Sequence, residues 1–163
     1  METVQVTAGA LEYREEGDPG GRPVVLLHGL LIPTVVDGYT DLGAAIDGVF
    51  TQAARDMADT GFANMCPVAS VAGEVADTVE ELRSATRDIF TAWIDGGAAY
   101  FTSRGLDEPL ARQVTTALIA GLEGAFLLAR AMRDTAPLLA TGATMAPQYR
   151  GIALAPRVGV DAR

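Results

Sequence analysis

The stretch from Leu118 to Ala129 constrains this chain most, because its helical pattern is apolar on nearly every side. It reads Leu-Ile-Ala-Gly-Leu-Glu-Gly-Ala-Phe-Leu-Leu-Ala, and Glu123 is its single charge. A helix that is apolar all round must be covered on more than one face. Other helices of the same domain can cover one face. We therefore expect another face to pack against a second chain.

Helical patterns occupy the chain from residue 37 to residue 147. Apolar side chains recur there at the i, i+3, i+4 and i+7 spacing of an amphipathic helix. Five helices are expected, and their start signals are Asp41, Pro67, Thr78, Asp107 and Asp134. Thr78 and Glu81 have the spacing of a capping box. The fifth helix is expected to fade at Gly142, since glycine weakens a helix, and to end by Pro147.

Residues 1–36 have a different pattern, in which apolar and polar residues alternate as in half-buried strands. Residues 23–29 form a continuous aliphatic run, which indicates a strand buried on both faces. The sequence therefore predicts a strand-like segment over 1–36, a helical domain over 37–147 and a loose tail over 148–163. The fold class is mainly α.

Charge and cysteine usage exclude several classes of protein. Lys and Arg total 12 and Asp and Glu total 21, for a net charge of −9. An acidic chain lacks the cations that neutralise phosphate, so direct nucleic-acid binding is not expected. A single cysteine favours a reducing compartment. The longest apolar run, 24–36, is too short to span a bilayer. We expect a soluble cytoplasmic protein without membrane attachment.

The sequence offers no recognisable catalytic or metal-binding set. His28 and Cys66 are the only histidine and cysteine, and together they cannot complete a site of the usual ligands. No Gly-x-Ser-x-Gly motif occurs. Neither enzymatic activity nor a cofactor is expected. Cys66 precedes a proline at a helix start, where the dipole can lower a thiol pKa, so a redox sensor and a structural thiol are both open.

The N-terminal pattern of a hairpin followed by a buried strand ending in His28-Gly29 resembles the entry of the α/β-hydrolase fold. The likeness covers about 30 residues. In that family a further strand lies between the hairpin and the His-Gly strand, and this chain has no candidate for it. The alternative function is therefore a hydrolase-derived fragment, inactive for lack of a nucleophile elbow.

The helical part resembles a different family. The turn Gly61-Phe62 leads into Met65-Cys66-Pro67-Val68-Ala69, Thr91-Ala92-Trp93 lies in the third helix, and 118–133 is followed by Asp134-Thr135-Ala136-Pro137-Leu138. With these features, residues 39–147 resemble the C-terminal regulatory domain of TetR-family repressors, in the LmrA/YxaF-like branch. That resemblance implies a domain that senses small molecules and forms homodimers.

The helix-turn-helix of such repressors is replaced here by residues 1–36. The resemblance therefore implies regulation without direct DNA binding. A heterodimer with a full-length TetR-type repressor is a further reading of the same module, and the sequence does not separate the two.

Large side chains on several helices are candidates to line an apolar ligand pocket: Met57, Phe62, Met65, Phe90, Trp93, Tyr100, Glu123 and Phe126. Small residues in one helical stripe are candidates for the dimer interface: Ala117, Gly121, Gly124 and Leu128. Each set has a simpler explanation. Aromatic residues at helical spacing also form ordinary cores, and a glycine stripe also serves close packing within one subunit. Glu123 could bind a polar group of a ligand, form a structural ion pair, or be exposed at the edge of the dimer interface.

Overall fold

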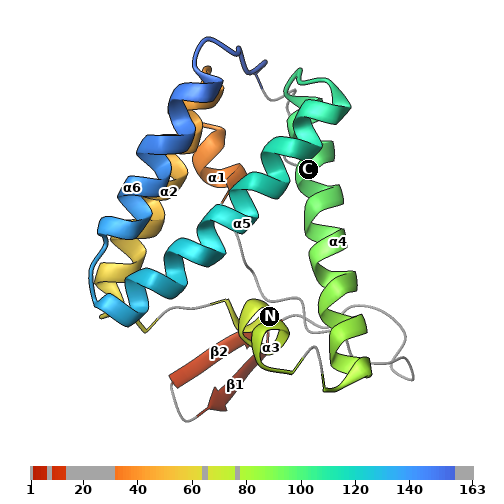
Figure 1. Ribbon diagram of the computed structural model, residues 1–163, viewed down its shortest axis with the longest axis vertical. Coiled ribbons are helices and arrows are strands. Elements are labelled where there is room, and N and C mark those ends of the chain that lie inside the picture. The colour runs from red at the N-terminus through yellow and green to blue at the C-terminus, as the bar shows by residue number, and fades with distance from the viewer. Residues whose placement is uncertain (1, 7–8, 14–31, 64–65, 76–77, 157–163) are drawn as a thin grey trace.

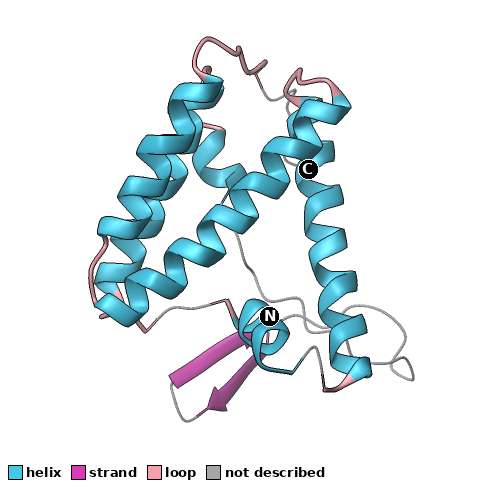
Figure 2. Cartoon of the chain, in the orientation of Figure 1, coloured by secondary structure: helices cyan, strands magenta, loops and turns pink. Residues whose placement is uncertain are grey.

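The computed structural model of the chain describes residues 2–6, 9–13, 32–63, 66–75 and 78–156. These residues are mainly helical (Figure 2), which confirms the predicted fold class. The elements are β1 Glu2–Val6, β2 Gly9–Tyr13, α1 Ile32–Val36, α2 Leu42–Asp59, α3 Pro67–Val75, α4 Glu80–Ser103, α5 Glu108–Met132, α6 Ala136–Met145 and the 3-10 helix η1 Ala146–Tyr149.

The strands β1 and β2 pair as an antiparallel hairpin, with Val4 opposite Leu11. This confirms the alternation that predicted strands there. The expected strand at 23–29, with His28, lies outside the described residues. Residues 32–36, which we had included in the strand-like segment, form α1 instead. Proline is well tolerated in a first helical turn, and the Asp37 amide donates to the Pro33 carbonyl at 2.9 Å.

The helices pack around α5, which crosses the molecule diagonally in Figure 1. On one side α2 and α6 lie next to each other, and α4 runs along the other side. The largest fully buried apolar side chains come from α2, α4, α5 and α6, namely Leu42, Ile46, Phe50, Met57, Phe101, Leu118 and Leu138. By length and composition alone α5 could also cross a membrane, but its buried residues pack on neighbouring helices, as in a core helix.

Four of the five predicted helix starts are confirmed: α3 begins at Pro67, α6 begins just after Asp134, and α2 and α5 have the predicted caps. The Asp41 carboxylate accepts from the Ala44 amide at 2.8 Å, and the Asp107 carboxylate accepts from the Leu110 amide at 2.9 Å. Both are N-cap hydrogen bonds. The N-cap of α4 is Val79, which makes no side-chain cap. The helix α4 thus begins one residue later than the capping box predicted.

The helix α6 ends before Pro147, as predicted, but Gly142 does not interrupt it. The helix continues to Met145. A Cβ atom at residue 142 would lie 2.6 Å from Cβ of Phe50 on α2. Gly142 thus allows α6 to approach α2 closely, and packing energy compensates for its low helix propensity.

The predicted loose tail is wrong over residues 149–155. The Leu42 amide donates to the Ile152 carbonyl, and the Leu154 amide donates to the Thr40 carbonyl, each at 2.9 Å. Leu154 is 3% exposed and belongs to the core. The segment has no helical or strand period, so the sequence pattern gave no sign of this packing. The predicted boundary between the N-terminal segment and the helical domain, at residue 37, stays a prediction.

Candidate functional site

Large apolar side chains are exposed near the end of α5 and near the start of α6. Leu127 and Leu128 are each 54% exposed, Met132 is 61% exposed and Leu139 is 46% exposed. No atom lies within 4 Å of a Cβ built on Gly124. The α5 residues follow helical spacing on one face. We call Gly124, Leu127, Leu128, Met132 and Leu139 the α5–α6 face.

The predicted stripe of small residues divides between two roles. Gly124 and Leu128 point to the exposed α5–α6 face, whereas Gly121 packs inside the chain. A Cβ on Gly121 would lie 3.1 Å from Met145 Sδ, 3.2 Å from Phe50 and 3.3 Å from Thr141. Ala117 is half-buried. The simpler explanation, close packing within one subunit, therefore accounts for Gly121.

Two of the predicted pocket residues form an aromatic pair on α4. The rings of Phe90 and Trp93 are perpendicular, with centroids 5.5 Å apart, and both side chains are half-buried. Edge-to-face pairs of this kind are favourable. Along the whole of α4 only Thr86, Ala98 and Phe101 are buried. The part of α4 around this pair is therefore only partly buried.

The other pocket candidates lie in different parts of the molecule. Met57 is fully buried in the core, and Phe126 is half-buried against it. Phe62 also packs partly on the core. Tyr100 donates its hydroxyl to Asp37 at 2.7 Å, far from the aromatic pair along α4. Met65 lies outside the described residues. The pocket candidates that the structure describes thus do not gather into one cluster.

Glu123 contacts Cys66 at the start of α3. Burial raises the pKa of the Glu123 carboxyl, while its hydrogen bond with the thiol opposes that rise. Burial, together with the Glu123 carboxylate, raises the pKa of the Cys66 thiol to about 11. The Ala69 amide also donates to Cys66 Sγ, at 3.4 Å. Because only the thiolate is strongly reactive, this environment favours the structural thiol over the redox sensor.

The turn between α2 and α3 has an unusual backbone. Gly61 and Phe62 both adopt left-handed conformations, with φ of 59° and 64°. For a bulky residue such as Phe62 this is a rare and costly state. Arg130 of α5 donates to the Ala63 carbonyl at 2.9 Å. Through Glu123 and Arg130, α5 thus contacts both the turn and the start of α3.

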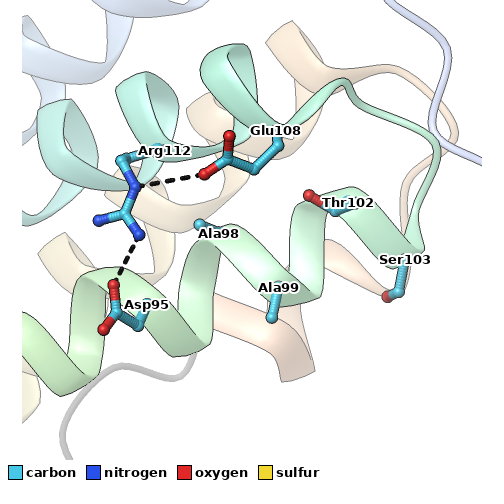
Figure 3. A pocket seen from close by; sticks show the side chains of 7 residues that line it. All are labelled: Asp95, Ala98, Ala99, Thr102, Ser103, Glu108 and Arg112. Atoms are coloured by element: carbon cyan, nitrogen blue, oxygen red, sulfur yellow. Dashed lines mark hydrogen bonds and ion pairs between the residues drawn. The ribbon is translucent and has the colours of Figure 1, made fainter.

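A surface hollow lies between α4 and α5, with a volume of about 510 Å³ (Figure 3). Arg112 joins its two sides, at 2.7 Å from Asp95 and 3.6 Å from Glu108. The other lining residues are Ala98, Ala99, Thr102 and Ser103. None of the predicted pocket residues lines this hollow. Its charges are exposed and paired with each other, which gives a ligand little to bind.

A second hollow, of about 280 Å³, lies on α6 and is lined by Ala140, Thr141, Thr144 and Met145. It also contains none of the predicted pocket residues. Over the described part of the chain, no three His, Cys, Asp or Glu side chains gather as metal ligands would.

Sequence reasoning missed the most strongly bound polar side chain, Arg104. It is 2% exposed and pairs with Asp37 at 2.9 Å. An arginine before a glycine at a helix end normally indicates a solvated cap. Tyr100, four residues earlier on the same helical face, was the one available sign of a buried partner.

Comparison with known proteins places this geometry in a family. The model of the "Transcriptional regulator LmrA/YxaF-like, C-terminal domain" matches residues 43–144, which run from the start of α2 to the end of α6. The uncharacterized HTH-type transcriptional regulators MT0206 and Rv0196, from two strains of Mycobacterium tuberculosis, are similar to the chain. Each is 29% identical over 133 residues, covering 74% of this chain and 67% of the relative.

Neither the family match nor the relatives support the α/β-hydrolase resemblance of residues 1–36. A hairpin and one aliphatic run are common to many folds, so that short pattern was not specific. The helical arrangement and the match over most of its length agree. The chain belongs to the TetR-type transcriptional regulators through an LmrA/YxaF-like C-terminal domain.

Proposed function

We propose that this protein is a small-molecule-sensing, dimerising regulatory domain of a TetR-type regulator without a helix-turn-helix. The family match begins at residue 43, and the described residues ahead of α2 are the β1–β2 hairpin and α1. The proposal includes a cytoplasmic location and no enzymatic role. It also includes no direct binding to nucleic acid, since the chain carries a net charge of −9.

The α5–α6 face carries the dimer proposal. Large apolar side chains on one exposed face lose free energy when covered, by roughly 25 cal/mol per Å² of buried apolar area. Gly124 on this face lets another backbone approach closely, because no side chain stands there. Arg130, the charged side chain in this part of α5, is held by the Ala63 carbonyl. A second copy of the chain presents the same apolar face, so a homodimer covers both.

Light scattering tests the homodimer. Gly124→Leu fills the open position without a clash inside the chain and should convert dimer to monomer, because overpacking a tight contact is destabilising. Gly96→Leu is the matched control, since Gly96 on α4 is equally open and lies away from this face. A wild-type protein that stays monomeric at high concentration contradicts the proposal.

The partly buried part of α4 around the aromatic pair supports ligand sensing. Phe90 and Trp93 present half-buried aromatic surface there, which suits an apolar ligand. Trp93 is the single tryptophan, so its fluorescence reports directly on this region. Titration with the apolar dye 8-anilinonaphthalene-1-sulfonate should change the Trp93 emission with saturation. A linear, non-saturating response would count against a binding site at this pair.

A second candidate function is pairing with a full-length relative. The observation that favours it is the same α5–α6 face in a chain whose helical domain matches that of HTH-type regulators. A mobility-shift assay with duplex DNA separates the two functions. The pure protein should give no shift at physiological salt. If it weakens the shift caused by a full-length relative, heterodimer formation is supported; an unchanged shift excludes it for that relative.

A further inference from the structure

The end of α4 carries a buried cation with partners from two distant parts of the chain. Nη1 of Arg104 donates to Oδ1 of Asp37 at 2.9 Å and to the Tyr100 hydroxyl at 2.8 Å. Nη2 donates to the Tyr39 carbonyl at 3.0 Å, and Nε donates to the Ala155 carbonyl. One guanidinium therefore joins α4 both to the segment before α2 and to the segment after η1.

Those two segments also bind each other. The Asp41 carboxylate, which caps α2, accepts from the Gly151 amide at 2.6 Å. Backbone hydrogen bonds join Leu42 to Ile152 and Leu154 to Thr40. The Ala155 amide donates to the Arg104 carbonyl at 2.7 Å, so backbone and side chain of Arg104 hold the same residue. We call residues 37–41 and 149–155 the two arms of this junction.

The burial of Arg104 makes the arms depend on each other. A buried charge that loses a partner is left with unsatisfied donors, and this is far more costly than the net value of the hydrogen bond. If only one arm dissociates from Arg104, some guanidinium N–H groups lose their acceptors. The arm that stays bound still shields them from water, so opening one arm alone is costly. Lysine cannot reproduce the arrangement, because its ammonium is a point charge and the partners surround a planar fork.

We propose that Arg104 is a latch that joins the two arms into one unit, which opens and closes as a whole. The unit sets the direction in which the chain before α2 leaves the helical domain. Val36, at the end of α1, is 1% exposed and packs into the core next to this unit. With the latch closed, α1 is fixed on the domain; with it open, α1 and the C-terminal arm are released together.

Hydrogen exchange of the full chain, followed by mass spectrometry, tests the latch. In Arg104→Lys, the backbone amides of residues 32–41 and 149–155 should exchange faster by the same factor, about tenfold. The reason is that the guanidinium hydrogen bonds to both arms are lost together. Exchange across the centre of α5 should not change. Arg112→Lys is the matched control, since Arg112 also bridges two carboxylates but is exposed, and neither arm should respond.

Two outcomes overturn the latch. One is faster exchange in a single arm, which shows that the arms open separately. The other is an equal rise throughout the helices, which shows that Arg104 only stabilises the fold. If Arg104→Lys does not fold, Tyr100→Phe decides, because it removes only the hydroxyl between Arg104 and Asp37. It should give a smaller rise, shared by both arms, and unchanged exchange in both would overturn the proposal.

Discussion

The helices α2 and α4 are both long, but they differ in how much of their surface is buried by neighbouring helices. Much of α2 is buried, since α1, α5, α6 and η1 all pack on it. In α4, which is longer, only Thr86, Ala98 and Phe101 are buried. The two helices also differ in their aromatic residues. Phe50 of α2 is 1% exposed, whereas Phe90 and Trp93 of α4 are half-buried.

This difference separates a closely packed half of the domain, around α2, from a less buried half, around α4. Packing around α2 leaves little space, as the close approaches at Gly121 and Gly142 show. The helix α4 packs on α3 as well as on α5, and Val68 is the buried residue of α3 among those whose side chains are described. Regions with few buried contacts open at the lowest free energy, and ligand-binding elements are drawn from them. The proposed sensing function therefore belongs to the less buried part of the domain, around α4.

The comparison is tested most strongly by two matched phenylalanine truncations. Phe50→Ala should lower the free energy of unfolding by about 3–5 kcal/mol, because it leaves a cavity in a close-packed core. Phe90→Ala should cost less, about 1 kcal/mol, since its side chain is only partly buried. Urea unfolding followed by circular dichroism measures both. Equal costs would show that α4 is as tightly packed as α2.

Adjacent glycines on α4 distinguish the face that packs on α5 from the face that does not. A Cβ at Gly97 would lie 2.4 Å from Thr115 of α5, whereas a Cβ at Gly96 meets no atom within 4 Å. Gly97→Ala should therefore destabilise the fold by about 1–3 kcal/mol. Gly96→Ala should stabilise it by up to about 1 kcal/mol through helix propensity. Thermal unfolding of the pair gives the signs, and the same sign for both would contradict this packing.

The α3–α5 contact should make stability depend on pH through Glu123. Burial raises the pKa of this carboxyl above its ordinary value of 4.5, so the folded state binds its proton more tightly than the unfolded state does. Stability should therefore fall as pH rises from 4.5 through the raised pKa. Glu123→Gln removes this contribution. Parallel profiles of unfolding midpoint against pH for the two proteins would refute the assignment.

The smallest expected effect concerns the reactivity of Cys66, not the stability of the fold. Its thiol pKa of about 11 predicts slow alkylation by iodoacetamide at pH 8, compared with a free cysteine. The rate should climb as the pH approaches that pKa. Glu123→Gln removes the carboxylate that raises the pKa and should accelerate alkylation at pH 8. A fast reaction in the wild type would restore the redox-sensor hypothesis.

The helices were readable from the sequence because their signals are local. Asp41 and Asp107 cap helices by hydrogen bonds to amides three residues on, and such contacts depend on spacing alone. The apolar pattern of 118–129 likewise identified the central helix. The segment 32–36 was assigned wrongly because Val, Ile and Pro in a short run suit either a strand or a first helical turn.

The polar contacts were not readable, because they join residues far apart in sequence. Arg104 meets Asp37 and Ala155 only once α1, α4 and the C-terminal arm are in place. The same limit applies to the small-residue stripe. Its spacing was correct, but only the packed structure shows that Gly121 faces α6 while Gly124 faces outward. Whether the aromatic candidates bind a ligand stays a prediction.

The two ends of the helical domain are neighbours in space. Asp41 and Ala153 form an isolated β-bridge, next to the hydrogen bond between Leu42 and Ile152. A domain whose ends meet can be inserted into another chain, or circularly permuted through a short linker, without unravelling its interior. Such a domain is a portable module. Its helices can keep one architecture while different N-terminal segments are joined to it.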